Sequence, residues 1–215
     1  MSITLRTVTP PANPAVTLDV MRAHLRVTTT DDDTLIATYT AAATDYVERI
    51  IDRALITRTL SQTVTRAPVP RQVALSPTPT LYPLNWPLAY PRPLIELRRA
   101  PLIAVSAVTW RDLDAVSTTL TAGTDYVADA TQEPGQVRLA ASLSFPNANA
   151  LTVTYTAGYG ATADAVPISL RQAIMIMTAH MYEGRGDVDA PAPSQVNALI
   201  SPFKIVTFGA NGWYA

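Results

Sequence analysis

Proline is distributed very unevenly along this chain of 215 residues. There are 18 prolines and only 8 glycines, and eight of the prolines lie between Pro68 and Pro93. Proline fixes φ and has no amide proton to donate, so a segment this rich in it forms neither a helix interior nor a central strand. We therefore expect residues 67–93 to be a Pro-rich insert or arm, partly in polyproline II conformation.

The N-terminal part predicts an extended arm followed by two helices. Pro10, Pro11 and Pro14 exclude a regular helix, so residues 1–16 are expected to be extended. Apolar residues then recur at helical spacing over about 18–26 and over about 32–53. Thr17 is a candidate N-cap of the first helix, and Thr30 or Asp31 of the second. These two helices form the predicted helical hairpin.

The C-terminal part predicts two more helices. Pro167 suits a first helical turn, and the apolar stripe that follows it indicates a helix to about residue 183. Ser194 is a candidate cap for a short helix over 195–201, which Pro202 ends.

The middle of the chain predicts short antiparallel strands. Thr and other β-branched residues dominate from Ile56 to Arg66, and Leu151–Thr156 alternates apolar residues with threonine. Shorter strand signals lie at 95–97, 105–110, 118–120, 126–127 and 137–139. The fold class is therefore α+β: a helical hairpin, an antiparallel β block with the Pro-rich insert, C-terminal helices and an extended C-terminal tail. We expect one domain over 17–202, after the arm 1–16 and before a tail 203–215.

Composition excludes several classes of protein. The chain is 48% hydrophobic, only 15% charged, and has a formal net charge of −1. A free-standing nucleic-acid binder usually carries a basic excess, so that role is disfavoured. There is no cysteine, hence no disulfide or thiolate site. We expect neither a signal peptide nor a membrane span. The low charge favours a surface covered by partners.

Enzymatic chemistry is poorly supported. His24 and His180 are the only histidines and have no partner at metal-ligand spacing. The triplet Asp31-Asp32-Asp33 is the best metal candidate, but capping of the helix that follows is the simpler interpretation. The chain contains no nucleophile-elbow or P-loop motif. We predict no catalytic residue, no metal site and no cofactor. Four arginines could contact DNA phosphate, although strand-edge or interface roles are the commoner ones: Arg92, Arg98, Arg99 and Arg111.

Aromatic and small residues suggest contacts with other proteins instead. The last thirteen residues are rich in large apolar side chains, which we take as candidate partner contacts: Phe203, Ile205, Val206, Phe208, Trp213 and Tyr214. Packing on the chain's own core is the alternative for them. The insert holds Tyr82, Trp86 and Tyr90, which a mere linker would not need. The run Ala41-Ala42-Ala43 would let another helix approach closely.

Residues Leu18 to Arg58 resemble the N-terminal signature of the head–tail connector, or adaptor, proteins of long-tailed bacteriophages and gene transfer agents. The matching features are a helix ending in His24-Leu25-Arg26-Val27, an acidic turn, a helix with the alanine run, and then Arg53-Ala54-Leu55-Ile56-Thr57. A second match runs from Leu151 to Asp187, through Ala157-Gly158-Tyr159-Gly160 and Pro167. The resemblance covers most of 17–208, and the insert and the N-terminal arm depart from it.

The resemblance implies a non-enzymatic structural protein at the head–tail junction of a virion. Its implied partners are the portal protein, neighbouring copies in a ring that is expected to have twelve subunits, and a stopper, head-completion or tail protein. Double-stranded DNA would pass through the ring without sequence-specific binding, and no membrane is involved. The near-neutral charge agrees with this, because strong phosphate binding would retard DNA.

Two other functions remain open at this point. One is a different neck component, such as a stopper or tail terminator, which the order helix, helix, β block, helix disfavours. The other is a metal-dependent enzyme that uses His24 with the Asp31–Asp33 carboxylates.

Overall fold

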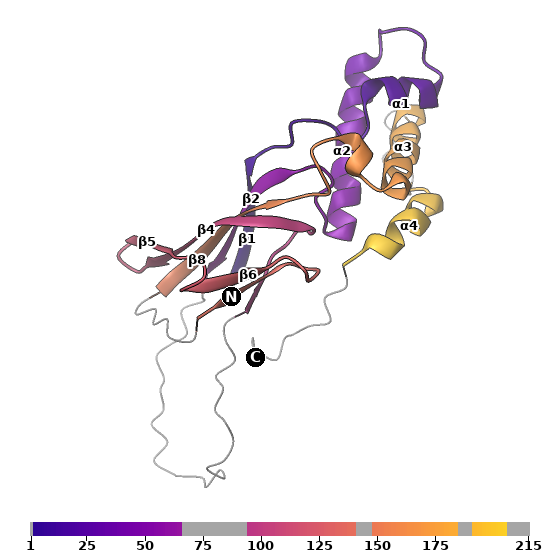
Figure 1. Cartoon of the computed structure of the whole chain (residues 1–215). Helices are drawn as coiled ribbons and strands as arrows, with labels where there is room; N and C mark the ends of the chain where they lie inside the picture. The colour runs from indigo at the N-terminus through magenta and orange to yellow at the C-terminus, as the bar shows by residue number, and fades with distance from the viewer. Residues whose placement is uncertain (1, 66–93, 141–147, 185–190, 206–215) are drawn as a thin grey trace, which may run out of the picture.

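Two parts lie side by side in the computed structural model, a helical layer and a β block (Figure 1). The structure describes residues 2–65, 94–140, 148–184 and 191–205. The elements run in the order β1, α1, α2, β2 to β8, the 3₁₀ helix η1 (Ala163–Ala165), α3, α4 and the 3₁₀ helix η2 (Ser201–Phe203). Among the described residues, no helix is long and apolar enough to cross a membrane. Helices and antiparallel strands occur together, so the α+β prediction is confirmed.

The β block consists of two antiparallel sheets in the described part of the chain. The larger has the order β1-β2-β8-β4-β5, and the smaller has the order β3-β7-β6. The strands are β1 (Ser2–Thr9), β2 (Arg58–Thr65), β3 (Leu94–Glu96), β4 (Leu102–Asp112), β5 (Ser117–Leu120), β6 (Tyr126–Asp129), β7 (Gln136–Leu139) and β8 (Ala148–Ala157).

Alternation along β2 and β8 explains how the sheets pack. Leu60 of β2 lies opposite Tyr155 of β8, and their side chains are buried with Val153. The buried residues of the smaller sheet belong to the same core cluster: Ile95, Tyr126, Val137 and Leu139. Because side chains alternate between the faces of a strand, the intervening residues occupy the outer face. That face is rich in hydroxyl groups: Thr59, Ser61, Thr63, Thr65, Thr152, Thr154 and Thr156.

The N-terminal segment is part of the sheet. Residues 2–9 are extended, as expected for the arm, and pair antiparallel with β2 as the edge strand β1. Ile3 and Val8 on this strand are exposed. The prolines at 10, 11 and 14 fall after the strand, where no ladder hydrogen bond is required of them.

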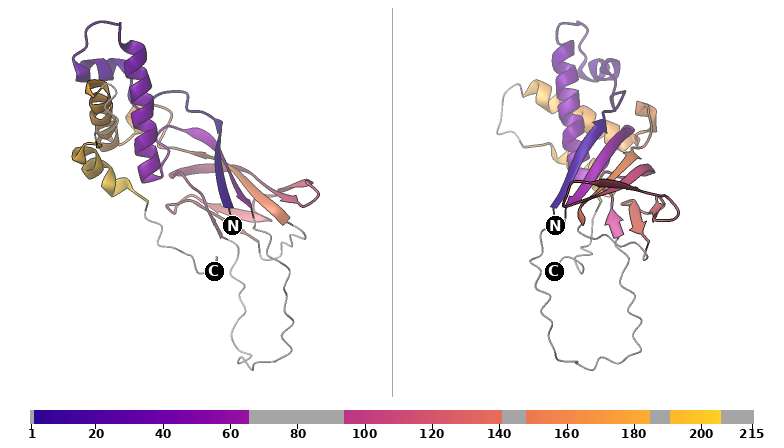
Figure 2. Two further views of the ribbon diagram at one scale, coloured as in Figure 1. Left: turned by 180° about the vertical axis from the view of Figure 1, so that it is seen from behind. Right: turned by 90° about the vertical axis from the view of Figure 1, so that its left-hand side faces the viewer.

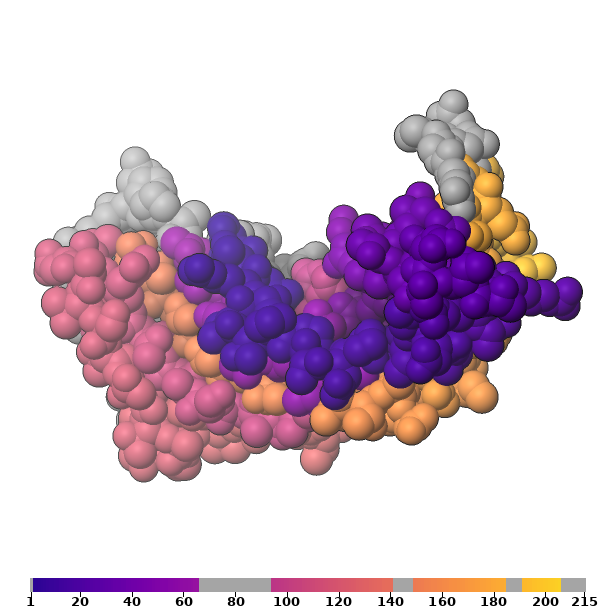
Figure 3. Space-filling model, turned by 90° about the horizontal axis from the view of Figure 1, so that it is seen from above, coloured from indigo at the N-terminus to yellow at the C-terminus, as the bar shows by residue number. Residues whose placement is uncertain are grey.

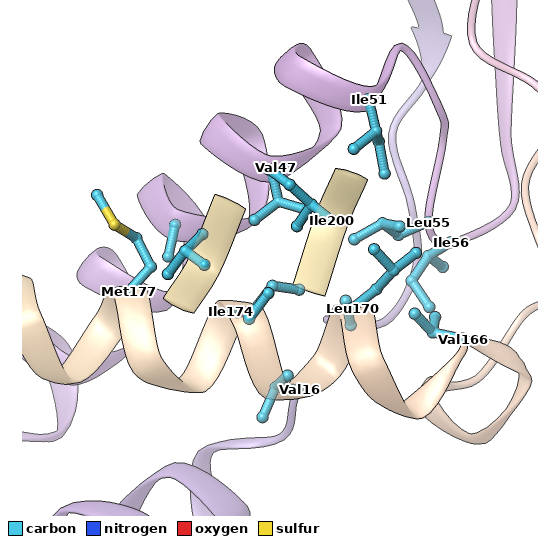
Figure 4. Packing of buried hydrophobic residues seen from close by; sticks show 14 of the residues in the cluster. Val16, Val47, Ile51, Leu55, Ile56, Val166, Leu170, Ile174, Met177 and Ile200 are labelled. Carbon is cyan, nitrogen blue, oxygen red and sulfur yellow. The ribbon is translucent and has the colours of Figure 1, made fainter. Parts of the chain in front are cut away.

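The helical layer is built from α1 (Leu18–Leu25), α2 (Asp33–Ile51), α3 (Ile168–Glu183) and α4 (Ser194–Ile200). Their apolar stripes meet in a second core, separate from that of the β block. Figure 4 shows Val47 and Ile51 of α2 and Ile174 of α3 lying between these two helices. Figures 2 and 3 show the helical layer at one end of the molecule and the β block at the other.

Helix ends differ in detail from the predicted ones. Thr17 is the N-cap of α1, as predicted, but its side chain makes no capping hydrogen bond. The N-cap of α2 is Asp32, rather than Thr30 or Asp31. Pro193 precedes α4 and Ser194 is its first residue, so the predicted Ser194 cap is wrong by one position. Propensity alone does not select among adjacent capping residues, because the cap depends on where the backbone leaves the helix.

Candidate functional site

A polar seam joins the two cores. We use this name for residues 52–58, 98–101 and 158–160, which run between the helical layer and the β block. Their backbones are bonded across it: Ala54 donates to the carbonyl of Ala100 at 2.9 Å, and Thr57 donates to that of Gly160 at 2.9 Å. The seam therefore fixes how the two parts are oriented relative to each other.

A buried carboxylate lies at the centre of the seam. Glu48 of α2 is 3% exposed and accepts hydrogen bonds from the backbone N–H of Leu55, at 2.9 Å, and from the guanidinium of Arg58. Burial raises the pKa of Glu48 above its ordinary value, against the opposing charge of Arg58. The sequence alone does not single out Glu48, because nothing in the pattern of α2 shows that this carboxylate is buried. Its burial becomes evident only when Arg58 of β2 is seen to lie against it.

Two arginines that were weighed as DNA contacts form ion pairs in the seam. Arg98 contacts Asp52 at 2.7 Å, and Arg99 lies 3.9 Å from the same carboxylate. The hydroxyl of Tyr155 donates to the carbonyl of Arg98 at 2.6 Å. Burial raises the pKa of the Tyr155 hydroxyl. Arg111 is exposed on β4, and Arg92 lies outside the described residues. Arg98 and Arg99 therefore pair within the chain, and neither is part of a strand.

Arg53 connects the seam to the C-terminal segment. Its Nε donates to the carbonyl of Phe203 at 2.6 Å, and its other guanidinium nitrogen contacts Glu133 at 2.6 Å. The backbone N–H of Ile205 also donates to the carbonyl of Ile51 at 3.2 Å. The hydrogen bond from Arg53 lowers the pKa of Glu133. These hydrogen bonds hold the C-terminal segment, as far as residue 205, against the end of α2.

The candidate tail contacts divide into two groups. Phe203 is half-buried against the helical core, as the alternative of own-core packing anticipated, and Ile205 is half-buried beside it. Four candidates lie outside the described residues: Val206, Phe208, Trp213 and Tyr214. The three aromatic candidates of the insert lie outside them too: Tyr82, Trp86 and Tyr90.

The alanine run is split between the interior and the surface. Ala43 is fully buried in the helical core, where α2 packs on α3, so it is unavailable for contact with another subunit. Ala41 and Ala42 are exposed. Consecutive residues on a helix point about 100° apart, which explains why three alanines cannot share one face.

The acidic triplet has structural roles. Asp33 forms an ion pair with Arg22 of α1, and Asp32 accepts a hydrogen bond from the hydroxyl of Tyr182. Within the described ranges, no group of three or more His, Cys, Asp or Glu side chains is arranged to hold a metal ion. Asp32 and Asp33 therefore tie the start of α2 to its neighbouring helices.

Two surface hollows on the helical layer were not anticipated. One, of about 580 Å³, is lined by residues that include Val20 of α1 and Ile168, Arg171 and Met175 of α3. The other, of about 530 Å³, is lined by Ala42, Asp45, Tyr46, Arg49, Ile50 and Met181. Their lining residues are neighbours of the buried apolar residues of the helices. The sequence pattern does not separate the two groups, because only the packing of the helices decides which side chains stay exposed.

Comparison with known proteins supports the resemblance. Residues 15–76 match the family described as "Phage gp6-like head-tail connector protein". A search of curated proteins finds no match.

Solved structures extend this match over nearly the whole chain. A chain of the "Neck of native GTA particle computed with C12 symmetry" is 26% identical, with a TM-score of 0.69 over 94% of this chain and 96% of that one. The "Neck of empty GTA particle computed with C6 symmetry" gives 27% identity and a TM-score of 0.69, and covers 94% and 96%. The "Virion of native gene transfer agent (GTA) particle" gives 25% identity and a TM-score of 0.69, and covers 94% and 95%. The family match and the neck structures together support a structural role for this chain at the head–tail junction of a virion, as a connector or adaptor.

Proposed function

We propose that this connector assembles as a ring beneath the portal, continues the DNA channel and offers a platform for the next neck or tail protein. The observation that carries the proposal is the match over 94% of the chain to a neck component of a particle with C12 symmetry. A ring of identical subunits has cyclic symmetry of this kind. Its role requires no chemical step, so we propose that the protein is not an enzyme.

The C-terminal residues 206–215 are proposed to dock on the portal. Two features support this: the segment contains Phe208, Trp213 and Tyr214, and Arg53 holds the chain just before it. Aromatic side chains are common anchors at protein interfaces. A tail that starts from a fixed point loses less entropy on binding than one that starts from a mobile end.

Deleting 206–215 tests the docking proposal. The deletion keeps Phe203 and Ile205 and their hydrogen bonds to Arg53 and Ile51, so we expect an unchanged melting temperature. Binding to purified portal should be lost. The matched control replaces the three aromatic residues of the tail with serine and keeps its length. Unimpaired portal binding by both variants would contradict the proposal.

The insert is proposed to contact a neighbouring subunit or another virion protein. Its aromatic residues Tyr82, Trp86 and Tyr90 support this, since an idle linker has no use for large apolar side chains. Replacing 67–93 with a short Gly-Ser linker should preserve the fold and impair particle assembly. Normal assembly of such particles would refute this role.

The mass of the protein in solution, alone and with portal, tests the main proposal. A ring that forms alone or on the portal is the expected result. A monomer that ignores the portal and binds a tail-tube or closure protein would favour the alternative of a stopper or tail terminator.

A further inference from the structure

Ile168 is unusually exposed for its residue type. It lies in the first turn of α3 and is 74% exposed, the most of any large apolar side chain among the described residues. Val20 of α1, which lines the same hollow, is 48% exposed. We call Val20, Ile168 and Met175 the Ile168 patch. Exposed apolar side chains that gather in one place, unlike scattered ones, mark contact surfaces.

A second apolar surface lies on α2. Its hollow is lined by Ala42, Tyr46 and Ile50 together with Met181 from α3, and we call it the Ala42 groove. These positions are three or four residues apart on α2, so they share one face of the helix. They are offset from the core positions Ala43, Val47 and Ile51, which face α3. The small side chain of Ala42 leaves space for a larger one.

Both surfaces have the same kind of polar rim. At the Ile168 patch, Arg171 contacts Asp164 at 3.3 Å, and Asp164 is 94% exposed. At the Ala42 groove, Arg49 forms an exposed ion pair with Asp45. Each surface thus offers one cation and one anion, which can exchange partners when the two surfaces meet. Such opposed charges fix the register of an interface.

We infer that the Ile168 patch of one subunit packs into the Ala42 groove of a neighbouring copy. This rests on the proposed ring, because a head-to-tail ring requires each subunit to present two different surfaces that fit each other. The occupant is a second copy of the chain, since the complement of each surface is found on the chain itself. In this contact Ile168 fills the space above Ala42, and Arg171 and Asp164 face Asp45 and Arg49.

Cross-linking between introduced cysteines tests the inference directly. The chain has no cysteine, so Ala42→Cys and Ile168→Cys supply the only thiols. Treating the double variant with a short bismaleimide should give a ladder of covalent oligomers, both free at high concentration and bound to portal. Each single variant should stay monomeric on a denaturing gel.

A matched control pairs Ala42→Cys with Leu113→Cys. Leu113 is 69% exposed but lies beyond the end of β4, in the β block. This pair should give no ladder. Covalent dimers from either single variant, or an equal ladder from the control pair, would overturn the head-to-tail contact.

Blocking one surface at a time gives an independent test. Ile168→Asp and Ala42→Arg change exposed side chains, so both variants should melt like wild type. Each alone should fail to form a ring. Their mixture should give dimers and no larger species, because one intact Ile168 patch still meets one intact Ala42 groove. A mixture that stays monomeric while wild type forms rings would contradict the inference.

The outcomes separate the two proposals. A wild-type ring together with no ladder from the double variant means that the ring stands and the assigned surfaces are wrong. No ring and no ladder, with or without portal, means that both proposals fail.

Discussion

At the scale of single residues, the seam depends on two carboxylates in opposite environments. Glu48 is buried and its burial raises its pKa, whereas Glu133 is partly exposed and its hydrogen bond from Arg53 lowers its pKa. Removing Arg58 alone would leave Glu48 buried without its cation, which is costly even where the intact pair contributes little. Both carboxylates hold the helical layer to the β block.

The two carboxylates are expected to give opposite dependences of stability on pH. The folded protein binds the Glu133 proton less tightly than the unfolded chain, so this contribution is present above the ordinary carboxyl pKa of 4.5 and is lost as pH falls through the lower folded pKa. Glu48 binds its proton more tightly when folded. Its effect is most favourable below the ordinary value, and stability declines as pH rises through the raised folded pKa.

Urea unfolding of E133Q, E48Q and wild type between about pH 3.5 and pH 7 checks this prediction. E133Q should be less stable than wild type at neutral pH, and the two should converge in acid. The difference between E48Q and wild type should move in favour of E48Q as pH rises. Parallel pH profiles for the two variants would contradict the assignment.

At the scale of elements, the end of β8 determines how the chain returns to the helices. Gly158 has a φ of +138°, and a Cβ placed there would lie 2.6 Å from the backbone nitrogen of Thr57. Its N–H donates to the carbonyl of Pro101 at 3.0 Å. The strand therefore turns into the seam at a point where only glycine fits, because both the torsion and the space exclude a side chain.

Gly158→Ala is expected to destabilise the protein much more than Gly123→Ala. Gly123 also has a positive φ, of +82°, but nothing lies within 4 Å of a Cβ placed there. The control should therefore show only the torsional cost, about 1 kcal/mol. Gly158→Ala adds a backbone clash and should cost about 3 kcal/mol or more. Equal free energies of unfolding for the two variants would contradict this prediction, because they would mean that the backbone near Thr57 shifts to make room for the added methyl group.

At the scale of the whole molecule, two separate cores are joined by backbone hydrogen bonds and ion pairs in one seam. Helix α3 follows β8 through Gly158–Gly160, and β2 follows α2 through Asp52–Thr57. The helical core is not continuous in sequence, because its residues come from before β2 and from after β8. We therefore expect the two parts to unfold as one cooperative unit.

Hydrogen exchange of an Ile174→Ala variant tests this cooperativity. Ile174 is fully buried in the helical core, and its truncation should cost about 3 kcal/mol. In a cooperative molecule, the slowest amides of β8 lose the same protection as those of α3. Loss of protection confined to α3 and its neighbours would show that the seam does not couple the layers. Val20→Ala, at an exposed site, is the matched control.

The sequence predicted the local elements well and their uncovered surfaces poorly. The spacing of Leu170, Ile174 and Met177 is enough to predict α3, and alternation from Leu151 to Thr156 is enough to predict β8. The exposure of Ile168 could not be predicted in this way. Ile168 follows Val166 and precedes Leu170, which are both buried, so the pattern favours burial of Ile168 as well. Glu48 was missed for the opposite reason, because a charged residue is expected at the surface.

What the sequence by itself determined is the α+β class, most of the helices and strands, and the resemblance to the connector family. All of these depend on local patterns of residues that can be read along the chain without knowing how the elements pack. Only the tertiary structure decided that residues 2–9 pair with β2, that Ala43 is interior while Ala42 is exposed, and that Arg53 holds the segment at Phe203. These facts depend on contacts between residues far apart in the chain. Such contacts form when the elements pack together, and the periodicity of any one segment does not specify them.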